Sequence, residues 1–422
     1  MLFMGMPSKI GDFKSDPMNY IKIYNANIIT PEGILKDGTL VIKNDKIAEI
    51  SAGNVDVPSA LEIDAGGKIL SPGFIDLHVH GGGGHDFMDN TVDAFLNIAR
   101  THAQYGTTSL MPTTLSCEKT DLLDTIKTYE AADPINDAGA QFVGLHIEGP
   151  YFSMNQKGAQ DPRYIRNPDA DEYNEILAST AAIRRWSAAP ELPGALAFAK
   201  TLKAKHILAA IAHTDAIYED VLEAFEEGFT HATHFYSCMS GVSRRNAYRY
   251  AGVIEAAYLL DNMTVEIIAD GVHLPPALLK LVYKIKGSKN TALITDAMRG
   301  AGMPEGKSIL GSLTTGIEVI IEDGVAKLPD RSAFAGSVAT ANQLVRNMIQ
   351  LADVPLSEAV EMITATPARI LNINAHKGVI KKGMDADLVI FDPQIKINTT
   401  IVRGKIVFTA SDAQDLPRKP KY

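Results

Sequence analysis

Between residues 73 and 296, apolar runs of strand length alternate with amphipathic segments of helix length, and this alternation restricts the fold more than any other feature of the chain. Strands are predicted at 74–80, 107–111, 141–148, 183–189, 206–213, 230–234, 264–269 and 291–296. Helices are predicted between most of them, for example at 91–105, 117–132, 195–205 and 216–227. Eight strands with intervening helices favour an α/β fold, a closed parallel (β/α)₈ barrel of the TIM type.

Short β-rich stretches flank this region on both sides. Strand-like runs separated by turn residues occur at 20–29, 39–43, 46–50 and 61–64. A hairpin is expected at 317–328 and helices near 338–351 and 356–371, after which β-rich runs return at 379–380, 387–391, 401–402 and 405–408. We therefore expect a barrel over residues 73–377 and a small discontinuous β-sandwich domain formed by 20–72 and 378–412, preceded by a loose polar leader at 1–19.

Charge and cysteine content restrict the partners and the compartment. The net charge is −10 and no long basic run occurs, so no nucleic-acid partner is expected. The two cysteines, Cys117 and Cys238, cannot form a disulfide framework and indicate a reducing compartment. The first residues lack the apolar segment of a secretory signal, and no apolar run approaches about 18 residues. A cytoplasmic protein without membrane contact is expected.

Histidines and carboxylates gather at the carboxyl ends of the predicted strands, where a barrel of this type carries its active site. They are His78, His80, Glu148, His213, His234 and Asp296. Strand alternation places His78 and His80 on one face. Histidine and carboxylate donors without cysteine suit Zn²⁺, Fe²⁺, Mn²⁺ or Co²⁺. The sequence therefore predicts a centre for one or two divalent ions at the mouth of the barrel.

These residue types in this order point to hydrolysis. A carboxylate such as Glu148 can bridge two metals about 3.5–4 Å apart, one held by the 78/80 pair and the other by His213 and His234. A divalent ion lowers the pKa of bound water from about 15.7 towards about 7, and that water would be the nucleophile. Asp296 is assigned as the acid/base that takes the proton of this water and delivers it to a leaving nitrogen. Metal-assisted hydrolysis of an amide is predicted.

Several motifs resemble a known enzyme family. The segment Pro72-Gly73-Phe74-Ile75-Asp76-Leu77-His78-Val79-His80 resembles the opening motif of the amidohydrolase superfamily, and residues 378–389 resemble its closing β motif. More specifically, three segments resemble the N-acetylglucosamine-6-phosphate deacetylases: His146-Ile147-Glu148-Gly149-Pro150, Ile268-Ala269-Asp270-Gly271-Val272-His273 and Thr295-Asp296-Ala297-Met298. The likeness runs from about residue 20 to about residue 410.

The resemblance implies hydrolysis of N-acetyl-D-glucosamine 6-phosphate to D-glucosamine 6-phosphate and acetate. It implies metal ligation by Glu148, His213 and His234, with a second ion in members that carry the strand-one His pair, and it implies acid/base catalysis by Asp296. Zinc is the first choice of metal, with Fe, Mn or Co as alternatives. The positions that match the substrate site are Ala159, Gln160, Ser237, Cys238, Arg245, Asp270, His273, Phe334, Ala335 and Gly336.

The resemblance also implies a homodimer. Within the family, a histidine and an arginine contact the phosphate, and they match His273 and Arg245, although Arg244 and Arg249 compete for the second role. In family members this arginine can reach across a dimer interface. A second copy of the chain is therefore an expected partner, beside the small amino sugar phosphate.

Two departures from the family pattern, and one position that varies within the family, bear on specificity. After His234 the family usually has Asn and a small residue, where this chain has Ser237-Cys238. The loop at 243–250 lacks the usual Arg-Glu-Pro. Gln160 stands where some members have His and others Gln, and an amide donates a hydrogen bond without carrying a charge. These changes leave the sugar epimer and the need for the phosphate open.

Three alternative functions follow. Deacetylation of a related amino sugar phosphate, such as N-acetylgalactosamine 6-phosphate, uses the same chemistry. A cyclic amidase of the dihydroorotase kind is less favoured, because strand 183–189 has no lysine to bridge two metals as a carbamate. A non-catalytic sugar-binding scaffold is disfavoured, because such proteins usually lose ligands and all six chemical groups are present here.

Overall fold

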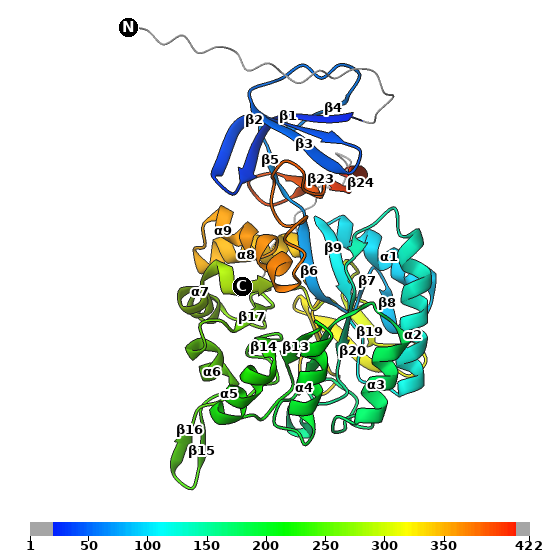
Figure 1. The fold of residues 1–422 in the computed structure, drawn as a ribbon, viewed down its shortest axis with the longest axis vertical. Coiled ribbons are helices and arrows are strands. Elements are labelled where there is room, and N and C mark those ends of the chain that lie inside the picture. The colour runs from blue at the N-terminus through cyan, green and yellow to red at the C-terminus, as the bar shows by residue number, and fades with distance from the viewer. Residues whose placement is uncertain (1–19, 411–422) are drawn as a thin grey trace.

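The computed structural model describes residues 20–410, so the leader expected at 1–19 and residues 411–412 of the expected small domain lie outside the described residues. Figure 1 shows a small β unit at the top and a larger α/β body beneath it. None of the described helices has the length and apolar character needed to span a bilayer.

Strands lie at all eight positions predicted for the α/β body. They are β6 (Phe74–Val79), β9 (Thr107–Pro112), β10 (Gln141–Phe142), β11 (Leu145–Glu148), β12 (Ile183–Ala188), β13 (Leu208–Ile211), β14 (Phe229–Ala232), β17 (Thr264–Ile267) and β18 (Thr291–Leu293). The expected third strand is divided into β10 and β11 at Gly144, whose φ is +113°. A glycine tolerates that backbone angle where other residues rarely do.

These strands form curled parallel sheets. One sheet has the order β10-β9-β6 and the other β11-β12-β13-β14-β17-β18. Isolated parallel bridges connect the two sheets: Thr113, just after β9, pairs with His146 of β11, and Val79 of β6 pairs with Ala297, beyond β18. The α/β class with a parallel sheet is confirmed, whereas complete closure into a barrel stays a prediction.

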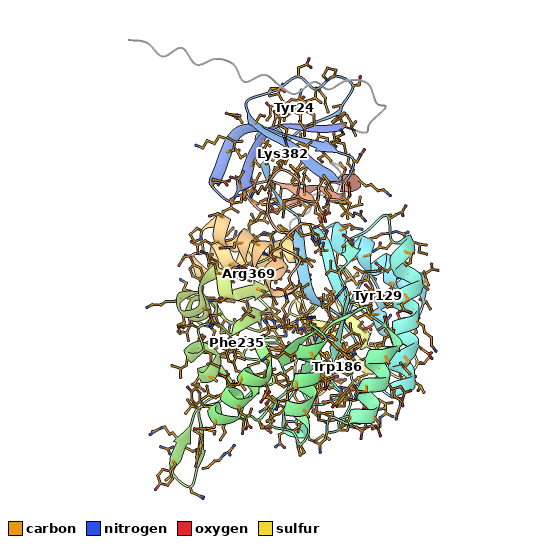
Figure 2. All side chains as sticks on the ribbon, viewed as in Figure 1. Tyr24, Tyr129, Trp186, Phe235, Arg369 and Lys382 are labelled. Atoms are coloured by element: carbon orange, nitrogen blue, oxygen red, sulfur yellow. The ribbon has the colours of Figure 1, made fainter. Side chains whose placement is uncertain are left out.

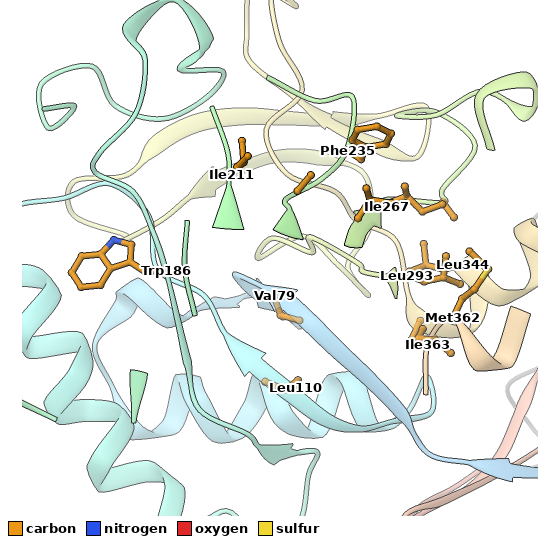
Figure 3. Close-up of a cluster of buried hydrophobic side chains, with 14 of the residues drawn as sticks. Val79, Leu110, Trp186, Ile211, Phe235, Ile267, Leu293, Leu344, Met362 and Ile363 are labelled. Atoms are coloured by element: carbon orange, nitrogen blue, oxygen red, sulfur yellow. The ribbon is translucent and has the colours of Figure 1, made fainter. Parts of the chain in front are cut away.

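Helices surround these sheets. They are α1 (Val92–Ala103), α2 (Lys119–Ala132), α3 (Ala170–Ser179), α4 (Ala195–Ala204), α5 (Tyr218–Glu227), α6 (Val253–Leu259), α7 (Pro276–Asn290), α8 (Ala341–Ala352), α9 (Leu356–Glu361) and α10 (Ala365–Ile370). The single helix expected at 356–371 is two helices, because Thr364 has φ −130° and ψ −82°. The core between sheet and helices contains Trp186, Ile211, Phe235 and Leu293, all at most 1% exposed (Figures 2 and 3).

The α/β body also contains short strands outside the two parallel sheets. They are β7 (Gly81–Gly82), β8 (His85–Asp86), β15 (Ser243–Arg245), β16 (Tyr248–Tyr250), β19 (Gly306–Leu310), β20 (Ile317–Glu322) and β21 (Val325–Lys327). The pair β20–β21 is the predicted hairpin. The segment at 243–250, expected as a loop, is the hairpin β15–β16, which projects from the lower edge of the body in Figure 1.

The small unit joins the two ends of the described chain. Its strands are β1 (Tyr20–Thr30), β2 (Gly33–Lys43), β3 (Lys46–Ala52), β4 (Leu61–Asp64), β5 (Ile69–Pro72), β22 (Leu388–Phe391), β23 (Ile397–Val402) and β24 (Lys405–Thr409). They form one sheet with the order β24-β23-β22-β5-β1-β2-β3, and β4 pairs with β1. The expected strand at 379–380 is absent from the described residues. The two-layered sandwich and the domain boundaries stay predictions.

The junction of the two ends is the pairing of β5 with β22. These strands run antiparallel, with Leu70 opposite Ile390. A buried apolar cluster, which includes Ile23, Leu40, Leu70 and Leu388, covers one face of this sheet. Burial of such a cluster is the main favourable contribution to folding of a unit of this size. Strand β5 ends at Pro72, directly before β6, and so connects the small unit to the strand that carries His78.

Candidate metal centre and active site

The six predicted histidines and carboxylates meet at the carboxyl end of the parallel strands, and each is at most 7% exposed. His78 lies within β6 and Glu148 ends β11, but the other four lie in the turns just beyond their strands. The predicted strands were therefore too long at these ends. The cause is local: His213, His234 and Asp296 have φ of +47°, +27° and +47°, and this left-handed conformation breaks the strand ladder.

Two triads of ligand atoms share the Glu148 carboxylate. One contains His78, His80 and Glu148, the other Glu148, His213 and His234, and within each triad the ligand atoms lie within 4.8 Å of one another. The Nε2 atoms of His78 and His80 are 3.1 Å apart, and those of His213 and His234 are 3.2 Å apart. Imidazole nitrogens that face each other beside a carboxylate are donors suited to a divalent cation.

The Glu148 carboxylate lies between the two histidine pairs. Its Oε1 is 3.1 Å from His234 Nε2, and its Oε2 is 3.5 Å from His80 Nε2. Burial raises the pKa of Glu148, but the surrounding histidines, His78 first, outweigh burial and hold it well below its usual range. Its Oε1 also lies 3.6 Å from His213 Nε2 and 3.5 Å from His78 Nε2, so the carboxylate contacts both pairs, as a bridging ligand would.

Backbone and side-chain acceptors orient the histidines. His213 Nδ1 lies 2.8 Å from the carbonyl oxygen of Gln156, so Nδ1–H donates and Nε2 keeps its lone pair for a metal. His78 Nδ1 lies 3.1 Å from Glu266 Oε1, which gives His78 the same tautomer. The Nδ1 atoms of His80 and His234 are buried without a hydrogen-bond partner among the described residues.

Glu266 belongs to a buried ionic network under the site. Arg185 donates to both of its oxygens, at 2.6 and 2.7 Å, and neither side chain is exposed. Burial raises the pKa of Glu266, but the charge of Arg185 and the hydrogen bonds from His231 and His78 lower it well below its usual range. The analysis of the sequence did not identify Arg185 or Glu266. Each is a charged residue within a short apolar strand, and that pattern was the available signal.

Asp296 lies against the first histidine pair. Its Oδ1 is 3.3 Å from His78 Nε2 and 3.2 Å from His80 Nε2. Burial raises the pKa of Asp296, but these two histidines outweigh burial and lower it below its usual value. The reciprocal effect is seen at His80: burial lowers its pKa, yet the hydrogen bond to Asp296 and the charge of Glu148 raise it to about 9. The cluster therefore favours positive charge at its centre.

A cavity of about 320 Å³ opens onto this cluster. Residues predicted for the site that line it are His80, Glu148, Ala159, Gln160, His213, His234, Ser237, Cys238, His273, Asp296, Phe334 and Gly336. Four lining residues were not predicted: Leu115, Tyr236, Leu310 and Ala333. These side chains carry no motif, and only the fold places them beside the candidate metal ligands. No lysine or arginine of the described residues lines the cavity.

Four predicted site residues do not line the cavity. His78 and Ala335 are fully buried, and Arg245 lies on β15, exposed, with its guanidinium over the Tyr250 ring at 5.3 Å. Asp270 acts on the neighbouring histidine: its Oδ2 lies 2.7 Å from His273 Nδ1, and its Oδ1 accepts the backbone N–H of His273 at 2.8 Å. Arg244 and Arg249, the competing arginines, oppose each other on the same exposed hairpin.

Both polar atoms of the Gln160 amide already have hydrogen-bond partners within the protein. Its Nε2 donates to Glu148 Oε2 at 2.8 Å, and its Oε1 accepts the backbone N–H of Ser116 at 2.9 Å. His146 is buried, and its Nε2 lies 2.7 Å from Ser187 Oγ. A larger cavity of about 930 Å³ lies at the amino ends of the strands, and none of the converging ligands lines it.

Comparisons with known proteins identify the family of the chain. A family model described as the amidohydrolase family matches residues 69–407. An N-acetylglucosamine-6-phosphate deacetylase of Lysinibacillus sphaericus is 34% identical over 91% of this chain and 97% of its own length. An N-acetylgalactosamine-6-phosphate deacetylase of Escherichia coli O157:H7 is 33% identical over 90% of this chain and 97% of its own length.

A solved structure is similar over nearly the whole chain. It is a mutant N-acetyl-D-glucosamine-6-phosphate deacetylase from Mycobacterium smegmatis in complex with N-acetyl-D-glucosamine-6-phosphate, with a TM-score of 0.84, 30% identity, and coverage of 93% of this chain and 100% of the other. The chain belongs to the amidohydrolase family. The resemblance drawn from its motifs to the amino-sugar-phosphate deacetylases within that family is confirmed.

The shared carboxylate makes a prediction about metal content. We expect Glu148→Ala to remove most bound metal, because its carboxylate serves both triads, whereas His80→Ala leaves the triad of Glu148, His213 and His234 intact. Elemental analysis of the purified variants measures this. Full metal content in Glu148→Ala would show that the carboxylate is not a ligand.

Proposed function

We propose that this protein hydrolyses the acetamide of N-acetyl-D-glucosamine 6-phosphate and releases acetate and D-glucosamine 6-phosphate. The observation that carries the proposal is the meeting of two triads on Glu148, with Asp296 beside them, at a cavity of about 320 Å³. Relatives at 34% and 33% identity are named for deacetylation of amino sugar phosphates.

The donor set fits one or two divalent ions. Glu148, His213 and His234 would hold one ion, and His78 and His80 would hold a second on the other side of Glu148. Zinc suits these nitrogen and oxygen donors, as do Fe²⁺, Mn²⁺ and Co²⁺. A bound ion of this kind lowers the pKa of coordinated water towards about 7 and polarises a carbonyl oxygen.

Asp296 is proposed as the acid/base. Because its pKa is held low, the carboxylate is ionised and ready to accept a proton from the attacking water. The same carboxyl then donates that proton to the sugar nitrogen, which leaves as a neutral amine. Gln160 holds the Glu148 carboxylate through its Nε2, and its own position is secured by the Ser116 backbone.

The remaining lining residues are proposed to hold the sugar phosphate. Asp270 accepts Nδ1–H of His273, so Nε2 of His273 is left to receive a hydrogen bond or, when protonated, to donate one to phosphate. The His273 ring lies 4.7 Å from the Phe334 ring, centroid to centroid, which limits its rotation. Ala159, Ser237, Cys238 and Gly336 supply the rest of the wall, and Ala335 supports it from behind.

The phosphate needs more positive charge than these residues provide, and we propose that a homodimer supplies it. Arg245 lies exposed on the projecting hairpin and outside the cavity of its own chain. In a dimer, the same arginine from a second copy would complete the phosphate site. We also propose that the parallel strands close into a (β/α)₈ barrel over residues 73–377, and that 20–72 and 378–410 form a separate sandwich.

Acetate release tests the proposal. N-acetylglucosamine 6-phosphate, its galacto epimer and unphosphorylated N-acetylglucosamine are compared, each with and without a chelator. Chelator-sensitive release from the first substrate is the expected result. Preferential release of acetate from the galacto epimer would be consistent with the same mechanism. It would indicate that this protein, like the Escherichia coli relative, is an N-acetylgalactosamine-6-phosphate deacetylase. No release from any sugar by protein with bound metal would overturn the proposal.

A further inference from the structure

A second cavity adjoins the one at the metal centre. Its volume is about 570 Å³, and it shares a wall with the first cavity. The wall consists of Leu115, Ala159, Gln160 and Leu310, which line both cavities. The opposite part of the first cavity, with Ser237, Cys238 and His273, has no contact with the second.

The proposed function orients a substrate against this wall. An amide carbon carries three substituents: the oxygen, the sugar nitrogen and the acyl carbon. The nitrogen must lie near Asp296 to receive a proton, and the phosphate end is assigned to His273. The acyl carbon therefore points to the remaining side, where Leu115, Ala159 and Leu310 form an apolar surface suited to a methyl group.

The wall between the two cavities contains one small side chain and one that is held by hydrogen bonds. Ala159 offers only a methyl group between the cavities, and Gln160 is turned towards Glu148, where its Nε2 donates at 2.8 Å. The lining of the second cavity also contains the apolar side chains of Met88 and Ile317. A chain that extends the acetyl methyl by a few carbons would enter a space that already exists.

The charges around the second cavity favour a neutral chain. Its lining includes the carboxylates of Asp89, Asp121 and Asp161 but no lysine or arginine of the described residues. Asp89 is paired with Arg299 at 2.6 Å, and Asp161 with Arg163 at 2.5 Å. The negative charge of these two carboxylates is therefore largely neutralised. A negatively charged acyl chain would meet the third, Asp121, without compensation.

We propose that the enzyme also removes neutral N-acyl groups longer than acetyl, such as propionyl and butyryl, with the acyl chain in this second cavity. The inference rests on the proposed function, because it uses the same amide hydrolysis. The bond that breaks is the amide C–N bond; water supplies the hydroxyl of the released fatty acid and the proton taken up by the amine. The specificity is set by the wall residues and by the depth of the cavity behind them.

The test compares kcat/KM for the N-acetyl, N-propionyl, N-butyryl and N-succinyl forms of glucosamine 6-phosphate. We expect butyryl within about tenfold of acetyl, because a methylene that is accommodated costs little, whereas a rejected one costs about 10–200-fold. We expect succinyl to be at least about tenfold slower than butyryl because its carboxylate faces Asp121. A butyryl rate more than about tenfold below acetyl would overturn the inference and leave the proposed function intact.

Variants of Thr315 test whether the acyl chain of the substrate lies in the second cavity. This residue lines the second cavity only and is exposed in the turn before β20. Thr315→Trp is expected to fill the cavity and lower the butyryl rate about tenfold or more while the acetyl rate stays unchanged; Thr315→Ser is the matched control. Equal butyryl rates in both variants would place the chain elsewhere and overturn the inference. Loss of acetate release from the unaltered protein would instead overturn the proposed function, and this inference with it.

Discussion

Replacing Asp296 by Asn is expected to lower kcat for acetate release by about 10²–10⁴-fold. The amide has the shape of the carboxyl group but cannot accept a proton from water or deliver one to the sugar nitrogen. Asn also tolerates the left-handed backbone of this position, where φ is +47°, so the fold should persist. Acetate release under saturating substrate, with metal content measured on the same sample, gives the result.

A matched variant separates chemistry from backbone effects. Asp353 also has a left-handed φ, +57°, but it is exposed at the end of α8. Asp353→Asn is therefore the same substitution at the same kind of backbone position, but Asp353 does not contact the site. We expect this variant to leave kcat unchanged. Near-normal turnover by metal-loaded Asp296→Asn would reject the acid/base role.

Replacing Arg185 by Met is expected to destabilise the protein by about 3–5 kcal/mol, because it leaves the buried Glu266 carboxylate without its cation. The side chains of both partners are fully buried, and Arg185 reaches both carboxylate oxygens. His78, which depends on Glu266 for its orientation, should also bind metal less tightly. Thermal unfolding with and without added metal measures both effects.

The neighbouring arginine provides the control. Arg184 lies in the same strand, β12, but its side chain is exposed. Arg184→Met should change stability by no more than about 0.5 kcal/mol, as is usual for surface positions. If the two variants unfold at the same temperature, the ionic network does not contribute to stability as inferred.

Residues at strand ends were predictable from the sequence. The alternation of apolar strands and amphipathic helices indicated parallel strands, and the carboxyl ends of parallel strands lie on one side of a sheet. His78, Glu148 and Asp296 could therefore be assigned to one site although they lie far apart in the chain. The strand ends themselves were less accurate, because the positive φ at residues such as His213 is not visible in the pattern.

Contacts between different strands were not predictable in this way. Arg185 and Glu266 are 81 residues apart, and nothing in the sequence indicates that they pair beneath the histidines. Asp270 matched a family motif, yet its role against His273 depends on a turn that brings the two side chains together. Arg245 was matched by position alone, in a segment that lacks the family's Arg-Glu-Pro, and only the fold shows that the hairpin carries it away from its own cavity.

The order of the residues by itself determined three things. It showed which side chains can bind metal, which strands they follow and which family the chain resembles. Those features depend on spacing over a few residues, where the backbone geometry is nearly constant. The shared wall between two cavities and the buried network under His78 depend on how distant strands pack. Packing brings together residues with no sequence relationship, and so these features became visible only when the strands were assembled into sheets.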